Sequence, residues 1–180
     1  MARNIEIKAR IGSVEALLPR ARALADGPET LIEQDDSFFT VPQGRLKLRQ
    51  FADGSAELIH YQRADTPEAK ASDYVRVPVP DPAALREALA RACGLAGRVR
   101  KRRWLLLAGQ TRIHLDRVEG LGDFMELEVV LREGQPEAEG VAIAEALMRD
   151  LGLQQAERLA GAYLDLLSPM TGGTASARKS

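Results

Sequence analysis

The sequence predicts an α+β fold built around one large antiparallel sheet. Eight segments alternate apolar and polar residues with the period of two that a β-strand imposes. Most of them follow one another through short turns rich in glycine, proline and aspartate, which join antiparallel neighbours. Helical patterns interrupt the strands at three or four places. An antiparallel sheet of this size twists, and it must either close or pack on itself.

The predicted strands share this alternation, and turn signals bound most of them. In the first strand Ile5 and Ile7 lie on the apolar face, whereas Glu6 and Lys8 share the other face. Asp53-Gly54 is a strong hairpin signal between the third and fourth strands. The eight segments are residues 3–11, 30–40, 45–51, 56–63, 73–79, 97–107, 110–118 and 123–132.

Four helices are predicted from apolar spacing and from their caps. Ser13 is an N-cap for a helix that extends to about Ala25, and Pro19 inside it predicts a kink or a later start. Asp81-Pro82 opens the second helix, with a cap followed by proline at the first position. The second, third and fourth helices are predicted at about 81–93, 137–151 and 154–167.

The composition indicates one globular domain, expected to span residues 1–170, with a disordered tail at 171–180. Apolar residues make up 45% of the 180 residues, which is enough for a sizeable core. The net charge of −1 gives no overall attraction to nucleic acid or to an anionic membrane, so any anion site must come from local arrangement. Cys93 lies in an apolar helical pattern, as a buried structural thiol does. No signal or membrane-spanning segment is evident, so we expect a cytoplasmic protein.

The polar faces of the strands carry an unusual concentration of charge. Acidic and basic side chains recur at alternate positions, where a solvent-facing sheet would mix serine, threonine, glutamine and lysine. Arginine and lysine bind phosphate oxygens, and carboxylates bind hard divalent ions such as Mg²⁺ or Mn²⁺. A single Glu-x-Glu is usually a solvated strand face, and a basic run such as Arg98–Arg103 is usually a surface patch. The combination of acidic and basic residues on the strand faces predicts a site for a metal ion and a polyanion.

Several motifs, taken in order, resemble the CYTH family, also called triphosphate tunnel metalloenzymes, over about residues 3–167. The resemblance implies an eight-stranded antiparallel β-barrel that forms a tunnel, with helices packed outside. Members bind a triphosphate and a divalent metal inside it, and they include inorganic, thiamine and RNA triphosphatases and adenylate cyclases. The sequences of the motifs are most similar to those of bacterial class IV adenylate cyclase-like proteins. The motifs are Ile5-Glu6-Ile7-Lys8, Gln34-Asp35-Asp36-Ser37-Phe38-Phe39, Leu46-Lys47-Leu48-Arg49, Lys101-Arg102-Arg103, the stretch from His114 to Gly122, and Phe124-Met125-Glu126-Leu127-Glu128.

The resemblance assigns roles to the charged residues. Asp116 is expected as a metal ligand or an orienting base, and His114 shares its strand face without an assigned role. The expected catalytic residues are Glu6, Lys8, Asp116 and Glu128. The expected triphosphate-binding residues are Lys8, Lys47, Arg49, Lys101, Arg103 and Arg112. The expected ligands of Mg²⁺ or Mn²⁺ are Glu6, Asp116, Glu126 and Glu128.

The chain departs from the family pattern at two places on its strands. The opening motif of the family is Glu-x-Glu-x-Lys, and here the first position is Asn4, which removes one charge from the metal cage. Some members place a lysine on the strand after Asp53-Gly54, where this chain has Ile59, His60 and Tyr61. Lys70, in the loop that follows, is a candidate replacement.

Three functions are compatible with these residues. The first is a metal-dependent enzyme that hydrolyses a phosphoanhydride bond of inorganic, nucleoside or thiamine triphosphate. The second is a class IV adenylate cyclase, in which the ribose 3′-hydroxyl of ATP attacks and pyrophosphate leaves. The third is a non-catalytic sensor of a triphosphate metabolite. The expected partner is a small-molecule triphosphate, with no membrane and no nucleic acid, and an exposed barrel edge or helix would allow a homodimer.

Overall fold

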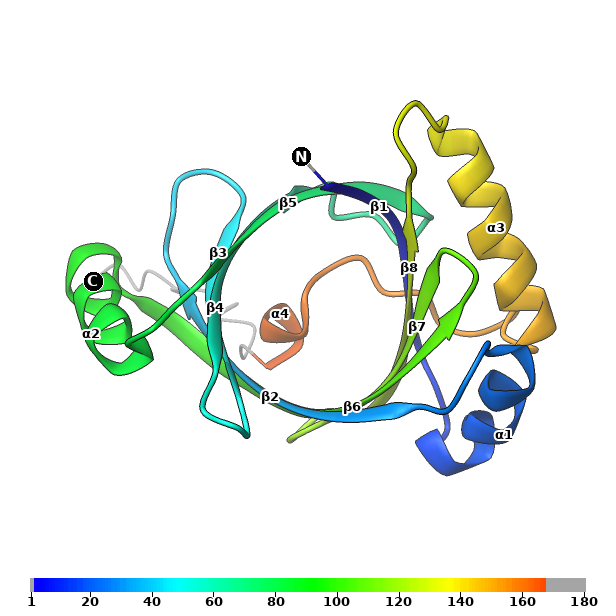
Figure 1. Ribbon diagram of the computed structural model, residues 1–180, viewed down its shortest axis with the longest axis horizontal. Coiled ribbons are helices and arrows are strands. Elements are labelled where there is room, and N and C mark those ends of the chain that lie inside the picture. Colours follow the sequence, from blue (N-terminus) through cyan, green and yellow to red (C-terminus); the bar gives the residue numbers. More distant parts are fainter. Residues whose placement is uncertain (1, 168–180) are drawn as a thin grey trace, which may run out of the picture.

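The computed structural model describes residues 2–167, and in it eight antiparallel strands close into a barrel (Figure 1). The predicted α+β fold with an eight-stranded barrel is confirmed, and each strand boundary lies within three residues of its predicted position. The tail predicted at 171–180 lies outside the described residues. The strands are β1 (Ala2–Arg10), β2 (Thr30–Phe39), β3 (Arg45–Phe51), β4 (Ala56–Arg63), β5 (Lys70–Pro78), β6 (Leu95–Ala108), β7 (Thr111–Val118) and β8 (Gly122–Val130).

The order of the strands decides which side chains meet inside. Around the barrel the order is β1-β5-β4-β3-β2-β6-β7-β8, and β8 pairs with β1 to close the sheet. Three strands separate β3 from β8 in either direction, so these two strands lie on opposite sides of the lumen. Glu6 pairs in register with Glu128, and Lys8 pairs with Glu126. Because side chains alternate along a strand, the same parity brings all four of these side chains inward.

Four helices accompany the barrel: α1 (Val14–Leu24), α2 (Pro82–Cys93), α3 (Glu137–Asp150) and α4 (Tyr163–Leu167). The predicted caps are confirmed, because Ser13 Oγ accepts a hydrogen bond from the Ala16 amide at 3.2 Å and Asp81 Oδ1 accepts one from Ala84 at 3.0 Å. The first helix starts at Val14 and continues past Pro19, so the later start considered above is wrong. None of the helices in residues 2–167 has the length and apolarity to cross a membrane.

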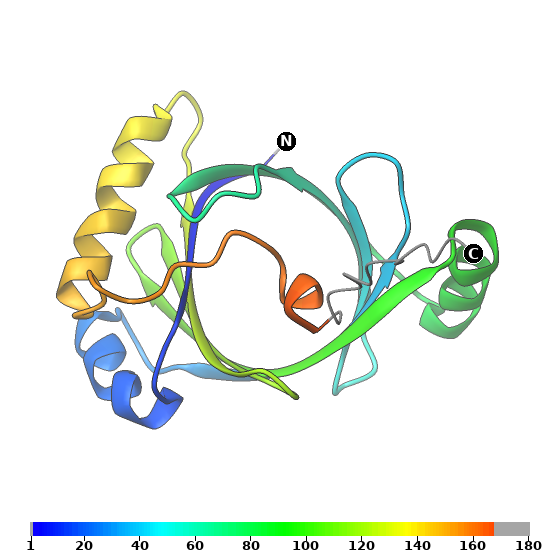
Figure 2. The ribbon, with the colours of Figure 1, turned by 180° about the vertical axis from the view of Figure 1, so that it is seen from behind.

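The helix predicted over 154–167 is wrong for most of its length, since helical structure begins only at Tyr163. The segment before α4 instead follows the edge of β1, where the Leu159 amide donates to the Lys8 carbonyl at 2.9 Å. The Arg10 amide donates to the Glu157 carbonyl, also at 2.9 Å. The end of β1 thus provides hydrogen-bond partners for backbone groups of this segment, which in a helix would bond to one another. From there the segment crosses the barrel opening to reach α4 (Figure 2).

The main apolar core lies outside the barrel wall. Helices α1 and α3 cover the outward side chains of β1, β7 and β8, among them Ile7, Leu115 and Leu127, which are fully buried. The approach of α3 is close, because a Cβ at Gly140 would lie 2.6 Å from Ile5 Cγ1. A smaller cluster under α2 contains Phe39, Leu48 and Ala56, with the half-buried Cys93 packed against it. Since the apolar faces are turned outward, the polar faces of the strands line the lumen.

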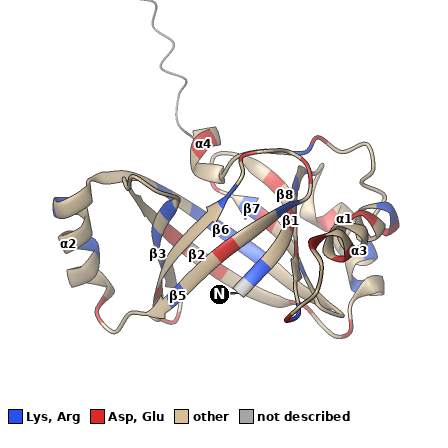
Figure 3. Ribbon diagram, turned by 90° about the horizontal axis from the view of Figure 1, so that it is seen from above, with Lys and Arg blue, Asp and Glu red and all other residues tan. Residues whose placement is uncertain are grey.

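At one end of the barrel, beneath α4, a cluster of apolar side chains fills the lumen. Phe38, Val99 and Phe124 point into the lumen there and pack with Tyr163, whose ring centroid lies 4.9 Å from that of Phe124. Viewed from the side of the barrel, α4 sits at one end, away from α1, α2 and α3 (Figure 3). The charged lumen is therefore covered at this end.

Candidate functional site

The barrel encloses a cavity of about 330 Å³ to which all eight strands contribute side chains. Eight basic and five acidic side chains line it, so the wall carries an excess of positive charge. Burial of so many charges is costly unless they are paired or bind ions of opposite sign. The basic residues are Lys8, Lys47, Arg49, Arg63, Arg76, Lys101, Arg103 and Arg112, and the acidic residues are Glu6, Asp36, Glu57, Glu126 and Glu128.

The structure brings the predicted site residues together. Nine of the ten line this one cavity, although they come from five different strands. The tenth, Asp116, is completely buried in the wall behind Arg103 and has no surface toward the lumen. The nine that line the cavity are Glu6, Lys8, Lys47, Arg49, Lys101, Arg103, Arg112, Glu126 and Glu128.

A buried carboxylate holds the two bases of β3. Asp36 Oδ2 accepts from Lys47 Nζ at 3.1 Å, and both of its oxygens accept from Arg49 at 2.7 Å. Burial alone would raise the pKa of Asp36, but the Arg49 and Lys47 charges outweigh it and hold that pKa well below its usual range. Burial, with the nearby Arg49 charge, lowers the pKa of Lys47 to about 8. Asp36 lies in the Gln34–Phe39 motif but was not among the predicted site residues, although it shares the inward face of β2 with Gln34 and Phe38.

Asp116 anchors a second basic residue. Its two oxygens accept from Arg103 Nε and Nη2, each at 2.6 Å, and Oδ2 also accepts from the Tyr163 hydroxyl at 2.9 Å. Arg103 Nη2 then donates to Glu126 Oε2 at 3.0 Å. With both oxygens occupied, Asp116 is suited to orient Arg103. This geometry favours a role in orienting Arg103 over the predicted role as a metal ligand, and the predicted role as an orienting base stays a prediction. Tyr163, on the short terminal helix, was not predicted to take part.

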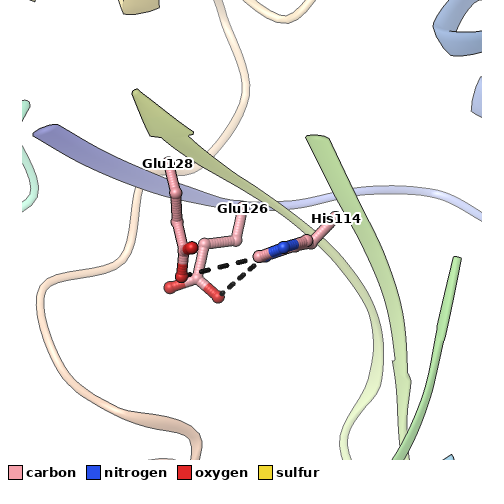
Figure 4. A group of neighbouring side chains, drawn as sticks. All are labelled: His114, Glu126 and Glu128. Carbon is pink, nitrogen blue, oxygen red and sulfur yellow. Dashed lines mark ion pairs between the residues drawn. The ribbon is translucent and has the colours of Figure 1, made fainter. Parts of the chain in front are cut away.

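An acidic cluster lies across the lumen from β3. His114 and Arg112 on β7 pair in register with Glu126 and Glu128 on β8. The side chains of His114, Glu126 and Glu128 point toward one another (Figure 4), and their ligand atoms lie within 4.8 Å of one another. His114 Nδ1 is 3.9 Å from an oxygen of each glutamate, and among residues 2–167 it has no hydrogen-bond partner. This donor set of carboxylates and imidazole is suited to a divalent cation.

Arg63 connects the acidic cluster to β1. Its Nη1 bonds to Glu6 Oε2 and lies 3.8 Å from Glu126 Oε1. Burial and the charge of Glu126 raise the pKa of Glu6, and Arg63 acts against them. Arg63 is absent from the predicted site, although the alternation of 56–63 puts it on the same face as Ile59 and Tyr61. A strand pattern defines such a face, but it does not say whether its last residue still reaches the lumen.

The two departures from the family pattern have local partners. With its amide oriented to satisfy its neighbours, the side-chain oxygen of Asn4 accepts from Arg112 Nη2 at 3.3 Å. Asn4 therefore contacts a base of the cavity. Lys70 begins β5 and does not lie in a loop, and its Nζ donates to the Ala160 carbonyl at 2.7 Å. Lys70 thus fastens the segment that covers the barrel end, so the structure does not support it as the replacement for a phosphate-binding lysine.

Solved structures share this fold. The PH1012 protein of Pyrococcus horikoshii OT3 is 26% identical with a TM-score of 0.81, over 91% of this chain and 98% of that one. A "putative adenylate cyclase" from Vibrio parahaemolyticus is 21% identical with a TM-score of 0.73, over 92% of this chain and 98% of that one. HpAC1 from Hippeastrum is 16% identical with a TM-score of 0.67, over 92% and 94%.

No curated protein matches the chain. The sequence model of one protein family, the CYTH domain, does match the chain. The match covers residues 2–163, which include all eight strands and every lining residue of the charged cavity. The resemblance found in the motifs is thereby confirmed, and the chain belongs to the CYTH family.

Proposed function

We propose that this protein binds a triphosphate together with a divalent metal ion inside the barrel and hydrolyses a phosphoanhydride bond. One observation carries the proposal. The bases of β3 and β6 line the same enclosed cavity as the cluster of His114, Glu126 and Glu128, and β3 lies across the lumen from β8. An extended polyanion in this cavity would contact the basic side chains of β3 at one end and reach the cation site beside β8 at the other.

The basic residues would hold the phosphate oxygens. The side chains of Lys101 and Arg103 are 5% and 6% exposed, and those of Lys47 and Arg49 are 13% and 11% exposed. Charge-assisted hydrogen bonds are strong in such surroundings. Asp36 and Asp116 keep these bases in place and offset part of their charge when no anion is bound. Lys8 lies 3.6 Å from Glu126 and 4.1 Å from the centre of the Tyr163 ring, and it would contact the phosphate next to the acidic cluster.

The acidic cluster fits a divalent ion of the kind the family implies. Glu126 and Glu128 would hold it, and Glu6, paired in register with Glu128, extends the cluster. A divalent ion bound there would offset negative charge on the phosphoryl group that is transferred. Arg112 Nε, which donates to Glu128 Oε2 at 2.9 Å, restrains that carboxylate. Mg²⁺ and Mn²⁺ both match such carboxylate oxygens, and we propose one of them as the working ion.

Hydrolysis is proposed ahead of cyclisation. The structure of HpAC1, called a putative adenylyl cyclase, is described as revealing a dominant triphosphatase activity. That protein shares the barrel of this chain, and the cavity here has the charge that a triphosphate chain requires. A class IV adenylate cyclase is the alternative, supported by the printed description of the Vibrio parahaemolyticus structure.

A substrate panel tests the proposal. The protein is incubated with inorganic triphosphate, ATP or thiamine triphosphate, each with Mg²⁺ or Mn²⁺, and both phosphate and cyclic AMP are measured. We expect metal-dependent release of phosphate without cyclic AMP. Cyclic AMP and pyrophosphate as the main products of ATP would replace hydrolysis by cyclisation. Tight binding of triphosphate without turnover under either metal would identify a sensor.

The depressed pKa of Lys47 predicts that triphosphate binding takes up a proton. In the free protein the pKa of Lys47 is about 8, and a bound polyanion favours the charged ammonium, so binding raises that pKa. The contribution of Lys47 to affinity is therefore full well below pH 8 and falls as the pH rises, by roughly tenfold between pH 7 and pH 9. Calorimetry with inorganic triphosphate at pH 8.5, in two buffers with different ionisation enthalpies, measures the proton uptake.

The matched variant for this measurement is Lys47→Arg. Arginine keeps its charge throughout this pH range, so the variant is expected to bind triphosphate with about one proton fewer taken up and with a weaker dependence on pH. Lys101 is unchanged in both proteins and contributes equally. Equal proton uptake by the two proteins would show that Lys47 does not change its protonation on binding.

A further inference from the structure

We infer that the cation site of this chain is a mixed imidazole and carboxylate site, in which His114 Nδ1 is a direct ligand beside Glu126 and Glu128. The inference rests on the proposed function and adds a ligand and a metal preference to it. The site should select Mn²⁺ and other transition ions over Mg²⁺, because one of its donors is nitrogen.

The first support is the state of the imidazole. His114 is 3% exposed, and its Nδ1 has no hydrogen-bond partner among the described residues. A buried polar atom without a partner is rare and calls for an unseen ligand or water. Nδ1 lies 3.9 Å from Glu126 Oε2 and 3.9 Å from Glu128 Oε1. These separations are too long for hydrogen bonds, but they are less than twice a metal–ligand bond of about 2.1 Å, so one ion can bridge the imidazole and either carboxylate. The ligand atoms of all three residues lie within 4.8 Å of one another.

The second support is how the neighbouring bases are placed. Arg112 occupies Glu128 Oε2, so the other oxygen of that carboxylate is the one that faces the imidazole. Arg103 Nη2 donates at 3.0 Å to Glu126 Oε2, the same oxygen that lies 3.9 Å from His114 Nδ1. A carboxylate oxygen can accept a hydrogen bond and still coordinate an ion, so the arginines orient the two carboxylates toward His114.

The third support is that β1 contributes a single carboxylate, that of Glu6, to the lining of the cavity. The family motif would provide a carboxylate at position 4, where this chain has Asn4, and the oxygen of that amide is turned to Arg112. Glu6 is ion-paired with Arg63. An all-oxygen cage built from β1 and β8 is therefore depleted in this chain, and the imidazole of β7 supplies the missing donor.

The choice of donors determines the choice of metal. Mg²⁺ demands oxygen ligands in octahedral geometry, whereas imidazole suits transition ions, whose affinity rises from Mn²⁺ toward Cu²⁺. Two carboxylates and one imidazole on a partly open site are typical of divalent transition ions. Mn²⁺ is the informative probe, because it binds the same carboxylates as Mg²⁺ and is paramagnetic.

Pulsed EPR of bound Mn²⁺ tests the inference. The full chain, prepared without a polyhistidine tag, is loaded with Mn²⁺ in the presence of inorganic triphosphate, and coupling of the electron spin to imidazole ¹⁴N is recorded. The chain has two histidines, and His60 lies on the outer face of β4 with Nε2 3.1 Å from the Gln43 carbonyl. His60→Gln should retain the ¹⁴N coupling, and His114→Gln should lose it. In a competition titration, His114→Gln should also reduce the preference for Mn²⁺ over Mg²⁺ by about tenfold.

The outcomes separate this inference from the proposed function. Bound Mn²⁺ without imidazole coupling in the wild type, together with normal phosphate release, would overturn the role of His114 and leave hydrolysis in place. Failure of the wild type to bind Mn²⁺ at all, with no phosphate release, would overturn both. If His114→Gln does not fold, the ¹⁴N coupling of the His60→Gln protein tests the inference, because the imidazole that remains in that protein is that of His114.

Discussion

Replacement of Glu128 by glutamine is expected to lower the rate of metal-dependent phosphate release by about a thousandfold. Glu128 lines the cavity, and its Oε1 faces the imidazole of His114 at 3.9 Å. Glutamine keeps the shape of the side chain but removes the charge that would hold a divalent ion. Loss of charge stabilisation worth several kcal/mol corresponds to about this factor in rate. Steady-state phosphate release from inorganic triphosphate, with saturating Mg²⁺ and then Mn²⁺, measures the effect.

The control is Glu33→Gln on the outer face of β2. Glu33 makes an ion pair of the same kind, with Arg102 at 3.0 Å, but both side chains are about half exposed on the barrel exterior. Removing its charge should leave turnover near the wild-type value. Wild-type turnover by Glu128→Gln at every metal concentration would remove this residue from the active site. A defect overcome by a large excess of metal would instead indicate weakened metal binding with intact chemistry.

The fold could be predicted from the sequence because its determinants are local. The period of two in Ile5-Glu6-Ile7-Lys8, the Asp53-Gly54 turn and the caps at Ser13 and Asp81 each specify one element, and all of them appear in the structure. The last segment behaves differently. Its residues have helical spacing, but the end of β1 offers backbone hydrogen bonds to Glu157 and Leu159. That competition depends on tertiary contacts, which no local pattern records.

The candidate site was predictable only in part, for a related reason. The alternation assigns Glu126, Glu128 and Lys47 to polar faces, and closure of the barrel turns those faces into one lumen. The alternation does not reveal which charges pair with each other. Asp36 and Arg63 lie on the inward faces of β2 and β4, yet their importance comes from partners on other strands. Tyr163 enters the site from outside the barrel, so no strand pattern could indicate it.

Replacement of Asp116 by alanine is expected to destabilise the fold by about 3–5 kcal/mol, because it leaves the buried charge of Arg103 without its partner. Asp116 is fully buried, binds Arg103 through both oxygens and lies 3.7 Å from Lys101. Without it, two neighbouring cations repel each other, and the Tyr163 hydroxyl, which donates to Asp116, loses its acceptor. Urea unfolding at pH 7, followed by circular dichroism, measures the change in the free energy of unfolding.

The matched variant, Asp35→Ala, removes a carboxylate one residue from Asp36 but on the outer face of β2. Asp35 also binds an arginine through both oxygens, Arg98, and lies 3.6 Å from Arg100, so the local chemistry is closely similar. It differs in exposure, since the Asp35 side chain is 28% exposed and that of Asp116 is 0% exposed. Water screens the outer pair, which limits its contribution to about 1 kcal/mol or less. Equal losses in the two variants would mean that burial does not amplify the inner pair. A bound triphosphate could not then be favoured by the desolvated charge of the lumen, and the case for a polyanion site would have to rest on contact geometry alone.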